Sequence, residues 1–364
     1  MECYKIALSA GDSVGTELIA QAKKLIAALE AVEDVQFQLF EFESCNPAIE
    51  RYGTAFRDED LKEAKTCCGI LFGNLGISSS QPLKPEQSPV YTLTAARNAF
   101  HVCTNIRPVR IQKEYESLSP LKQKITEKGI DILIVRDLMG GMITGARHHR
   151  EGIYGREASD LEYYNEQIVR HSAEFAFQSA EFRHRKVTSV DKANILSSSK
   201  LWRETVKETG KRYPQIMLEN DYVDHTAMQL LTAPWEYDVI LTSNVFGDIL
   251  ADEIAQISGA PWLFGSGEIA MDGRGIYTPN QLHHPQGDQL AGKGIVSPYG
   301  ILNALSLLIR YSCNRGDLAE RINRALERAI GERLFTAEAV PEGGNVVSTK
   351  DLGDIITAYI VGKG

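Results

Sequence analysis

Three arginines have the side-chain type and the positions to bind a substrate in this 364-residue sequence. Arg97, Arg107 and Arg136 lie at or near expected strand ends or turns. A guanidinium group binds a carboxylate through paired hydrogen bonds, so three converging arginines would suit a di- or tricarboxylic acid. Taken singly, each is explained as simply by a surface charge. Arg136 stands apart because it directly follows an apolar strand, where α/β proteins place their sites.

The segment NVFGDILADE offers oxygen ligands for a hard cation. Asp248 and Asp252 are four residues apart, so on a helix they share one face, and Asp224 could supply a third oxygen. Mg²⁺ and Mn²⁺ are bound by such oxygens. The alternative is that the two aspartates only favour the dipole near the start of a helix. The residue pattern leaves both interpretations open.

Lys192 directly follows the expected strand Val187–Val190. It could act as a general base whose pKa is lowered by burial and a nearby metal. It could equally form a salt bridge with Asp191 or another neighbouring carboxylate. The sequence alone does not separate these roles.

Composition and charge narrow the class of protein. The net charge of −9 gives no reason to expect a nucleic acid or an anionic membrane as a partner. No apolar run approaches the roughly 18 residues that span a bilayer, and the first residues read as a strand, not as a signal peptide. The six cysteines show no CxxC pair. We therefore expect reduced thiols and a cytoplasmic protein.

Strands and helices alternate along the chain, which predicts an α/β fold. Tyr4–Ser9 is an expected buried strand, Gly11–Gly15 a turn, and the helix after it carries Leu18, Ala22, Leu25, Ile26 and Leu29 on one face. Further strands are expected at Gly69–Gly73, Ile132–Val135, Val187–Val190 and Val239–Thr242, and helices at Asn165–Arg183, Asp317–Ile330 and Thr349–Ile360. In the helix Asn165–Arg183, apolar residues recur every seven positions at Ile168, Phe175 and Phe182. No GxGxxG motif follows a strand, so the Rossmann fingerprint is absent.

Seven segments together resemble the β-decarboxylating dehydrogenase family, and within it the isopropylmalate dehydrogenases most closely. They are GDSVGTEL, RNAFHVCTNIRP, LIVRDLMGG, VTSVDKANIL, YVDHTAMQL, NVFGDILADE and LAGKGIVSP. The segments are independent, run nearly from end to end and keep the family's order. The resemblance implies an isopropylmalate dehydrogenase-like two-domain α/β fold, distinct from the Rossmann fold, with a central sheet flanked by helices.

The same resemblance implies that the two domains have different functions. Residues 1–103 and 258–364 would form a large cofactor-binding domain, and residues 104–257 a small central domain that makes a homodimer. The active sites would be shared between the two subunits. NAD is favoured over NADP, because no Lys-x-Tyr pair stands where phosphate-binding members have one.

Site residues carry over from the family by position. Arg97, Arg107 and Arg136 would hold the carboxylates of a malate. Mg²⁺ or Mn²⁺ would be bound by Asp248 and Asp252 with Asp224 of the partner subunit. Lys192 of the partner subunit would take the hydroxyl proton. Asn194, His284 and Asp288 would contact the cofactor.

Some positions depart from the family pattern. Ile143 stands where a tyrosine normally helps to protonate the enol, Ser297 replaces an asparagine, and the cofactor segment TPNQLHHPQGDQLAGKG is about three residues longer. By the same resemblance, Val90, Leu93 and Thr94 would stand at the pocket for the substituent of the malate. Because this pocket is apolar, we expect a 3-alkyl- or 3-arylmalate such as 3-isopropylmalate as substrate.

Ile143 also keeps two other functions open. A diverged enzyme could obtain its acid elsewhere, for instance from His148, His149 or Tyr154. A non-catalytic paralogue could instead pair with an active decarboxylating dehydrogenase subunit.

Overall fold

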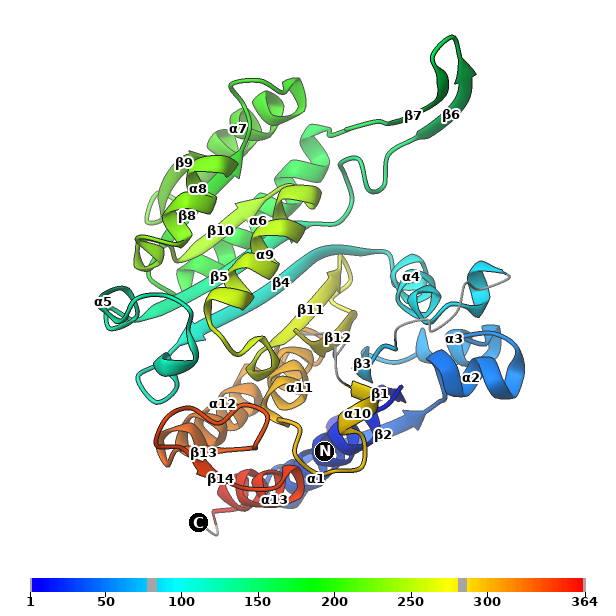
Figure 1. The fold of residues 1–364 in the computed structure, drawn as a ribbon, viewed down its shortest axis with the longest axis vertical. Coiled ribbons are helices and arrows are strands. Elements are labelled where there is room, and N and C mark those ends of the chain that lie inside the picture. The colour runs from blue at the N-terminus through cyan, green and yellow to red at the C-terminus, as the bar shows by residue number, and fades with distance from the viewer. Residues whose placement is uncertain (1, 77–83, 281–286, 363–364) are drawn as a thin grey trace. The chain divides into compact units, whose positions relative to one another are not determined.

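The computed structural model describes residues 2–76, 84–280 and 287–362. The chain divides into two compact units, Met1–Val102 with Ala260–Gly364, and Cys103–Gly259. Both consist of strands covered by helices (Figure 1). The predicted α/β class, with a large sheet flanked by helices, is confirmed. No helix of the described residues is long and apolar enough to cross a membrane.

The first unit has a mainly parallel arrangement of strands in the order β2-β1-β3-β12-β11. Only β11 and β12 pair antiparallel among these neighbours. The strands are β1 (Glu2–Gly11), β2 (Val35–Glu41), β3 (Gly69–Asn74), β11 (Gly265–Ala270) and β12 (Gly275–Pro279), with a separate small pair β13 (Leu334–Phe335) and β14 (Asn345–Val346). All six residues of β3 are buried, as expected of a strand covered on both faces.

Helices cover these strands in layers. They are α1 (Gly15–Val32), α2 (Cys45–Tyr52), α3 (Asp58–Ala64), α4 (Pro89–Phe100), α10 (Gly287–Leu290), α11 (Tyr299–Tyr311), α12 (Gly316–Gly331) and α13 (Thr349–Ile360). α1 and α11 pack against strands, and α12 and α13 pack against these two helices. The predicted apolar face of α1 is confirmed, since Leu18, Ala22, Leu25, Ile26 and Leu29 are all buried.

The turn between β1 and α1 needs glycine. Gly11 has a φ of 66°, and a Cβ at Gly15 would lie 1.8 Å from the carbonyl oxygen of Ala10. Opposite this turn, Asn74 at the end of β3 accepts from the backbone N–H of Asp12 at 3.0 Å. The carboxyl ends of β1 and β3 are thereby fixed together.

The second unit is built on the strand order β4-β5-β10-β8-β9. β4 and β5 are antiparallel and the remaining neighbours are parallel. The strands are β4 (Val102–Ile111), β5 (Ile130–Asp137), β8 (Lys186–Asp191), β9 (Met217–Tyr222) and β10 (Val239–Thr242), and a separate hairpin is formed by β6 (Arg147–Gly152) and β7 (Gly155–Asp160). The helices are α5 (Gln123–Thr126), α6 (Glu166–Glu181), α7 (Ser197–Gly210), α8 (Val223–Leu230) and α9 (Asn244–Ile257). Helices α6 and α7 pack on each other and on strands β5, β8, β9 and β10. Helices α8 and α9 pack on each other and on the same four strands.

Helix α6 confirms the predicted helix and shows which of its sides is buried. The helix exists, and it begins after Asn165, whose side chain accepts from the backbone N–H of Ile168 at 3.0 Å. Its buried face, however, contains Val169, Ala173, Ala176 and Phe177, whereas Phe182 is 90% exposed. The sevenfold spacing followed the sides of the helix instead of its buried stripe, because small alanines fill the contact with the sheet.

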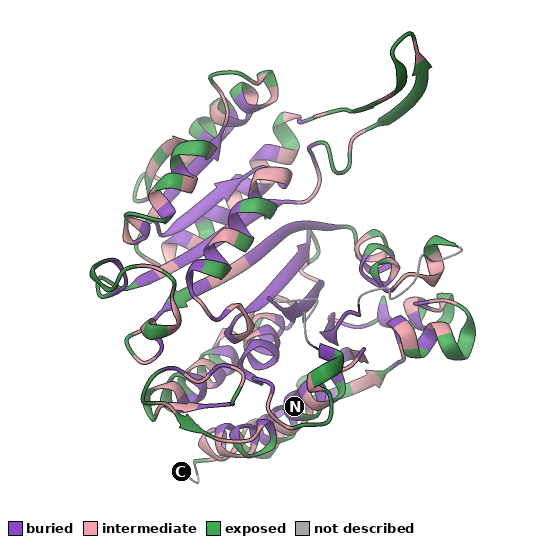
Figure 2. Cartoon of the chain, in the orientation of Figure 1, coloured by how far each residue is buried: buried purple, intermediate pink, exposed green. Residues whose placement is uncertain are grey.

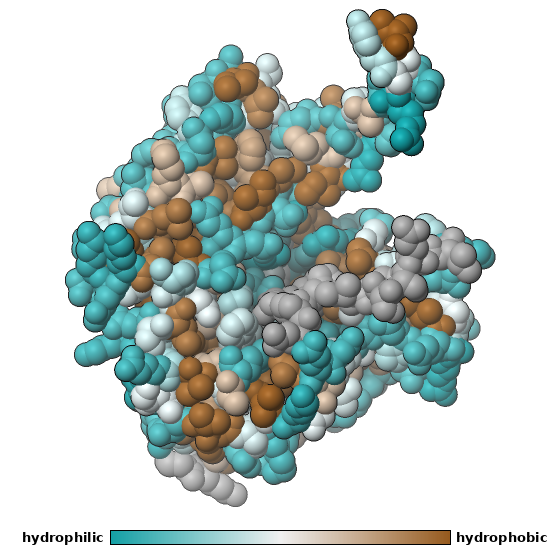
Figure 3. Space-filling view, viewed as in Figure 1, coloured by the Kyte–Doolittle hydropathy of each residue, from teal (hydrophilic) through white to brown (hydrophobic). Residues whose placement is uncertain are grey.

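The β6–β7 hairpin is the least buried part of the second unit (Figure 2). It extends as a two-stranded arm, and Ile153 and Tyr154 at its turn are 90% and 92% exposed. Hydrophobic atoms gather at this tip in the space-filling view (Figure 3). An isolated hairpin is only marginally stable in water, so the arm lacks the packing that the other strands have.

Candidate active site

Arg136 lies at the carboxyl end of β5 and is 4% exposed. Its Nε and Nη2 donate to Oδ1 of Asn244 at 3.1 and 2.8 Å, and its Nη1 donates to Asp248. Both partners are on α9. The helix can approach this closely because residue 247 is glycine: a Cβ there would lie 2.6 Å from Cγ of Arg136. Gly247 therefore lets α9 lie directly on the arginine.

One turn further along α9, Asp252 pairs with a second arginine. Nη1 of Arg107, on β4, donates to Oδ1 of Asp252 at 2.5 Å. The Arg107 side chain is only 15% exposed, whereas that of Asp252 is 77% exposed. Nε of Arg107 is buried and has no hydrogen-bond partner among the described residues. The predicted sharing of one helix face by Asp248 and Asp252 thus produces two adjacent arginine–aspartate pairs.

Arg97 belongs to the first unit, in the last turn of α4. Its Nε donates to Oε2 of Glu268 at 2.7 Å, and its Nη2 donates to the other oxygen of that carboxylate. Glu268 lies on β11 and is 7% exposed. The structure therefore joins Arg107 and Arg136 through α9, while Arg97 has a buried carboxylate of its own unit as its partner.

Lys192 and Asp224 contact each other in the second unit. Lys192 follows β8, and its Nζ donates to Oδ1 of Asp224 in the first turn of α8. This hydrogen bond is the main cause that lowers the pKa of the fully exposed Asp224. Asp191 is not the partner of Lys192, because both of its oxygens accept from Arg203, at 2.8 and 2.9 Å. Asn194 is exposed in the loop that follows.

The acidic residues do not converge within one chain. Among the described residues, no group of three His, Cys, Asp or Glu side chains could hold a metal ion. Asp248 and Asp252 face arginines of their own unit, and Asp224 faces Lys192. Exposed carboxylates one helical turn apart are nevertheless suitable donors for Mg²⁺ or Mn²⁺, which take oxygen ligands.

The residues expected at the cofactor are only partly described. His284 lies outside the described residues. Asp288 is exposed on α10, and its negative charge helps to raise the pKa of Asp12. Burial is the larger cause, and together they raise the pKa of Asp12 to about 6. Asp12 accepts from the backbone and side-chain nitrogens of Asn46 at 3.0 and 2.9 Å. The structure thus brings the β1–α1 turn near Asp288.

Helix α4 carries the residues expected at the substrate's substituent. Leu93 is 9% exposed and Val90 is 54% exposed, so the two apolar side chains differ in how far the helix covers them. Thr94 is exposed, and its hydroxyl donates to the carbonyl oxygen of Val90 at 3.4 Å. Ser297 is buried in the first unit, and its backbone N–H donates to Glu338 at 2.7 Å.

Two functional candidates could not be found from the sequence. Glu268 is 171 positions from Arg97, and Glu162 is 20 positions from Met142, whose backbone N–H it accepts at 2.8 Å. Glu162, in the segment between β7 and α6, therefore contacts the loop that carries Ile143, and burial raises its pKa. No motif marks either glutamate, since each is identified only by a contact made in the fold.

The residues proposed as substitutes for the family tyrosine lie on the hairpin. His148 and His149 are exposed on β6, and Tyr154 is in the β6–β7 turn. Ile143 itself is 40% exposed. Glu162, by contrast, binds the backbone N–H of Met142, the residue next to Ile143.

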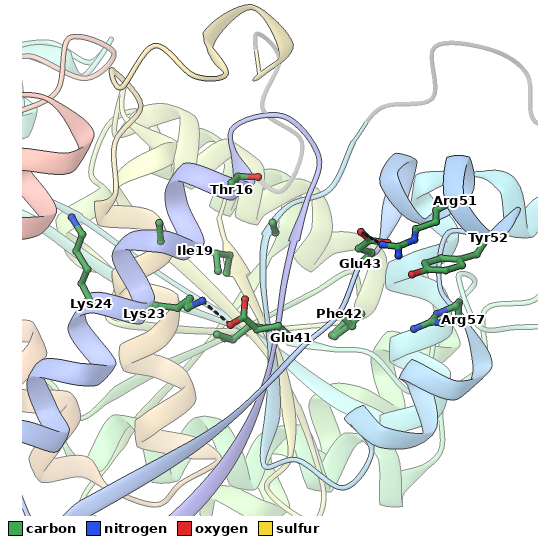
Figure 4. Close-up of a pocket in the computed structure, with 13 residues that line it drawn as sticks. Thr16, Ile19, Lys23, Lys24, Glu41, Phe42, Glu43, Arg51, Tyr52 and Arg57 are labelled. Atoms are coloured by element: carbon green, nitrogen blue, oxygen red, sulfur yellow. Dashed lines mark hydrogen bonds and ion pairs between the residues drawn. The ribbon is translucent and has the colours of Figure 1, made fainter.

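A separate hollow of about 790 Å³ opens in the first unit between α1, the end of β2 and α2 (Figure 4). Its cations are already bound to carboxylates: Lys23 to Glu41 at 2.6 Å, and Arg51 to Glu43 at 3.0 Å. None of the expected site residues lines it. This hollow is thus not the place where the arginines and aspartates meet.

Comparison with solved structures defines the class of fold. Isocitrate dehydrogenase from Methylococcus capsulatus is similar with a TM-score of 0.79 at 24% identity, covering 98% of this chain and 99% of that one. A beta-decarboxylating dehydrogenase from Thermococcus kodakarensis gives a TM-score of 0.75 at 26% identity, covering 98% and 96%. The fold is that of the β-decarboxylating dehydrogenases.

Sequence comparison then identifies the family. The model for isocitrate/isopropylmalate dehydrogenase matches residues 5–356. The 3-isopropylmalate dehydrogenase of Clostridium pasteurianum is 36% identical over 356 residues, 98% of this chain and 99% of that protein. That of Salmonella typhimurium is 38% identical over 359 residues, 98% of each chain. The chain belongs to the isocitrate/isopropylmalate dehydrogenase family and is a decarboxylating dehydrogenase, as its sequence motifs predicted.

Proposed function

We propose that this enzyme catalyses the NAD-linked, divalent-metal-dependent oxidative decarboxylation of a 3-substituted malate with an apolar alkyl or aryl substituent, such as 3-isopropylmalate. The observation that carries the proposal is the alternation of cations and carboxylates at α9, where Arg136 meets Asp248 and Arg107 meets Asp252. Guanidinium groups suit the two malate carboxylates, and the exposed aspartates suit a hard cation. The relatives named 3-isopropylmalate dehydrogenase support the same substrate class.

Each polar group of this site would have a defined task. Arg107 and Arg136 orient the malate carboxylates, and the unpartnered Nε of Arg107 is available as a further donor. Asp248, Asp252 and Asp224 would hold Mg²⁺ or Mn²⁺, which when bound polarises the hydroxyl and carbonyl oxygens of the substrate. Lys192 would accept the hydroxyl proton as a neutral amine, after its ammonium group has given up a proton to solvent. Its ion pair with Asp224 keeps its ammonium group oriented in the absence of ligands.

A second copy of the chain would complete the site. Helices α8 and α9 carry exposed apolar side chains, with Met228 at 60%, Leu231 just beyond α8 at 48%, and Ile249 at 62% exposure. Such side chains are typical of a surface that is covered in an oligomer. In a homodimer of twofold symmetry, Lys192 and Asp224 of the partner subunit would meet Asp248 and Asp252. The hairpin arm, with its exposed tip, is a second candidate contact.

Glu162 is the group that we propose as the proton donor to the enol. Its carboxylate contacts the loop that carries Ile143. Its raised pKa favours the protonated carboxyl group, which is the form that can donate a proton to the enol. The position that is a tyrosine in the family would then be free to face the substituent. NAD would be held in the first unit, near Asp288 and Asp12.

The proposal is tested by NADH formation with malates that carry hydrogen, isopropyl, benzyl or carboxymethyl at C3. Each is assayed with Mn²⁺ and with excess chelator. We expect the highest kcat/KM with isopropyl or benzyl, little with carboxymethyl, and no turnover with chelator. Full activity in chelator would refute the metal site, and a preference for carboxymethyl would refute the apolar pocket.

A further inference from the structure

Two cysteines that are far apart in the sequence meet at the edge of the first unit opposite the β1–α1 turn. Cys68 directly precedes β3, and Cys313 follows the end of α11. Neighbouring atoms fix this approach: a Cβ on Gly69 would lie 3.5 Å from Oγ of Ser312. Each thiol lies close enough to the other to shift its pKa. Neither takes part in the proposed reaction.

The surroundings hold both cysteines in place. The backbone N–H of Cys68 donates to the carbonyl oxygen of Lys5 at 2.8 Å, and that of Cys313 donates to Leu308 at 3.2 Å. Between them, Ser312 Oγ donates to the carbonyl oxygen of Gly273 at 2.8 Å and hydrogen-bonds the Tyr277 hydroxyl at 2.7 Å. Both thiols are therefore attached to rigid elements, so their proximity is a property of the fold.

The two thiols differ in access and in acidity. Cys68 is half-buried, whereas Cys313 is 4% exposed. The hydrogen bond with the Cys313 thiol is the main cause that lowers the pKa of Cys68 to about 6, and the same contact raises the pKa of Cys313. A thiolate is the form that reacts with oxidants, and a sensor thiol typically lies beside a second, resolving thiol. Cys68 and Cys313 match these two roles.

The adjacent Cys67 provides an internal contrast. It is 1% exposed, and its Sγ donates to the carbonyl oxygen of Glu63 at 3.7 Å. Burial raises its pKa to about 11. One peptide bond thus separates a reactive thiol from an inert one.

We propose that Cys68 and Cys313 form a reversible intramolecular disulfide when the enzyme meets a hydroperoxide. The Cys68 thiolate attacks one peroxide oxygen, the O–O bond breaks, and the released hydroxide takes up a proton to become water. The sulfenic acid on Cys68 is then attacked by the sulfur of Cys313. The S–S bond forms as the S–O bond breaks, and the leaving hydroxide takes the Cys313 proton as a second water. A dithiol reverses the reaction by thiol–disulfide exchange.

The disulfide would join the segments next to β3 and α11 in the first unit and close a loop of about 245 residues that includes the whole second unit. Such a cross-link restricts the unfolded chain, so the oxidised protein should melt at a higher temperature than the reduced one. This cross-link lies at the amino end of β3, whereas Asn74 at its other end holds the β1–α1 turn.

The test uses the full-length reduced protein, treated at pH 7 with a small excess of hydrogen peroxide, blocked with N-ethylmaleimide and digested with trypsin without reduction. We expect the peptide that begins at Thr66 to be linked to the peptide Tyr311–Arg315. The link should persist in Cys67→Ser and be lost in Cys68→Ser. Dithiothreitol should remove both the link and the rise in melting temperature.

A second measurement separates a reactive pair from an accidental contact. The rate at which iodoacetamide alkylates Cys68 should have its midpoint near the pH that its lowered pKa predicts, and Cys313→Ala should move this midpoint up toward the ordinary cysteine value of about 8.5. An unchanged midpoint, a link through Cys67, or oxidation of Cys68 beyond the sulfenic acid without any link to Cys313 would overturn the proposal.

Discussion

Arg97 in the first unit and Arg136 in the second both bind a carboxylate, but the two carboxylates differ in exposure. The Glu268 side chain is 10% exposed, and that of Asp248 is 51% exposed. Separating a buried pair costs ~3–5 kcal/mol, whereas an exposed pair contributes only ~0–1 kcal/mol. Each pair thus has one buried member, the carboxylate in the first unit and Arg136 in the second, and under the proposed function the more exposed Asp248 carboxylate would be the one free to leave for a cation.

This difference in the exposure of the carboxylate distinguishes two roles of an arginine–carboxylate pair. In the second unit, arginine and aspartate keep each other oriented, and under the proposed function ligands would replace each of them with a stronger partner. In the first unit, Glu268 neutralises Arg97 permanently and fixes the end of α4, the helix that carries Val90 and Leu93. We infer that Arg97 offers a weaker charge to the substrate than the other two arginines do.

The largest effect should come from two variants that each damage a different half of the proposed shared site. Lys192→Ala and Asp248→Asn should each abolish NADH formation. Mixed after subunit exchange, they should recover about a quarter of the wild-type activity, since half the dimers are hybrids with one intact site. Activity of the mixture is compared with each variant alone. If exchange is shown by a tagged subunit and activity stays absent, the shared site is wrong.

The exposure of Glu162 is intermediate between that of the buried Glu268 and that of the exposed Asp248. Its carboxylate binds a backbone N–H instead of an arginine. Glu162→Gln keeps an acceptor for Met142 but cannot donate a carboxylic proton, so kcat should fall by ~10²-fold. In the wild type, kcat should decline as pH rises through the raised pKa of Glu162, and this decline should vanish in Glu162→Gln.

Adding Ile143→Tyr to Glu162→Gln provides the control. If the loop presents residue 143 to the enol, tyrosine should restore part of the lost rate. Retention of full activity in Glu162→Gln would show that Glu162 only holds the loop in place, and Ile143 would then be assigned to specificity alone.

The smallest expected effect is on the free energy of unfolding, and it tests whether the two kinds of arginine–carboxylate pair differ in stability. Glu268→Gln should lower the free energy of unfolding by about 2 kcal/mol, less than for a fully buried pair because Arg97 is one-third exposed. The matched change Asp252→Asn, at a 77% exposed side chain, should cost less than ~1 kcal/mol. Urea unfolding of both variants measures this. Equal losses would show that exposure does not separate the two kinds of pair.

Local patterns predicted the frame of the molecule well. The helical spacing of Leu18, Leu25 and Leu29 gave the buried face of α1, and β10 has the predicted bounds Val239–Thr242. These succeed because burial repeats with the period of the element itself. In α6 the residues spaced by sevens do not mark the buried face, which contains three alanines together with Val169 and Phe177.

The candidate site was predictable only where its residues share one element. Asp248 and Asp252 are one turn apart, and that spacing is visible in the sequence. The pairing of Arg97 with Glu268 is not, because it depends on α4 meeting β11 across 171 positions of chain. A contact that forms only through tertiary packing produces no periodic pattern in the sequence.

Gly247 has a consequence for what the sequence can tolerate. In a helix interior alanine is favoured over glycine by about 1 kcal/mol, so on propensity alone Gly247→Ala would strengthen α9. Here the added methyl would meet Cβ and Cγ of Arg136 at 2.7 and 2.6 Å. The chain thus forgoes local helix stability at a position where the absence of a side chain lets the Arg136 guanidinium reach Asn244 and Asp248.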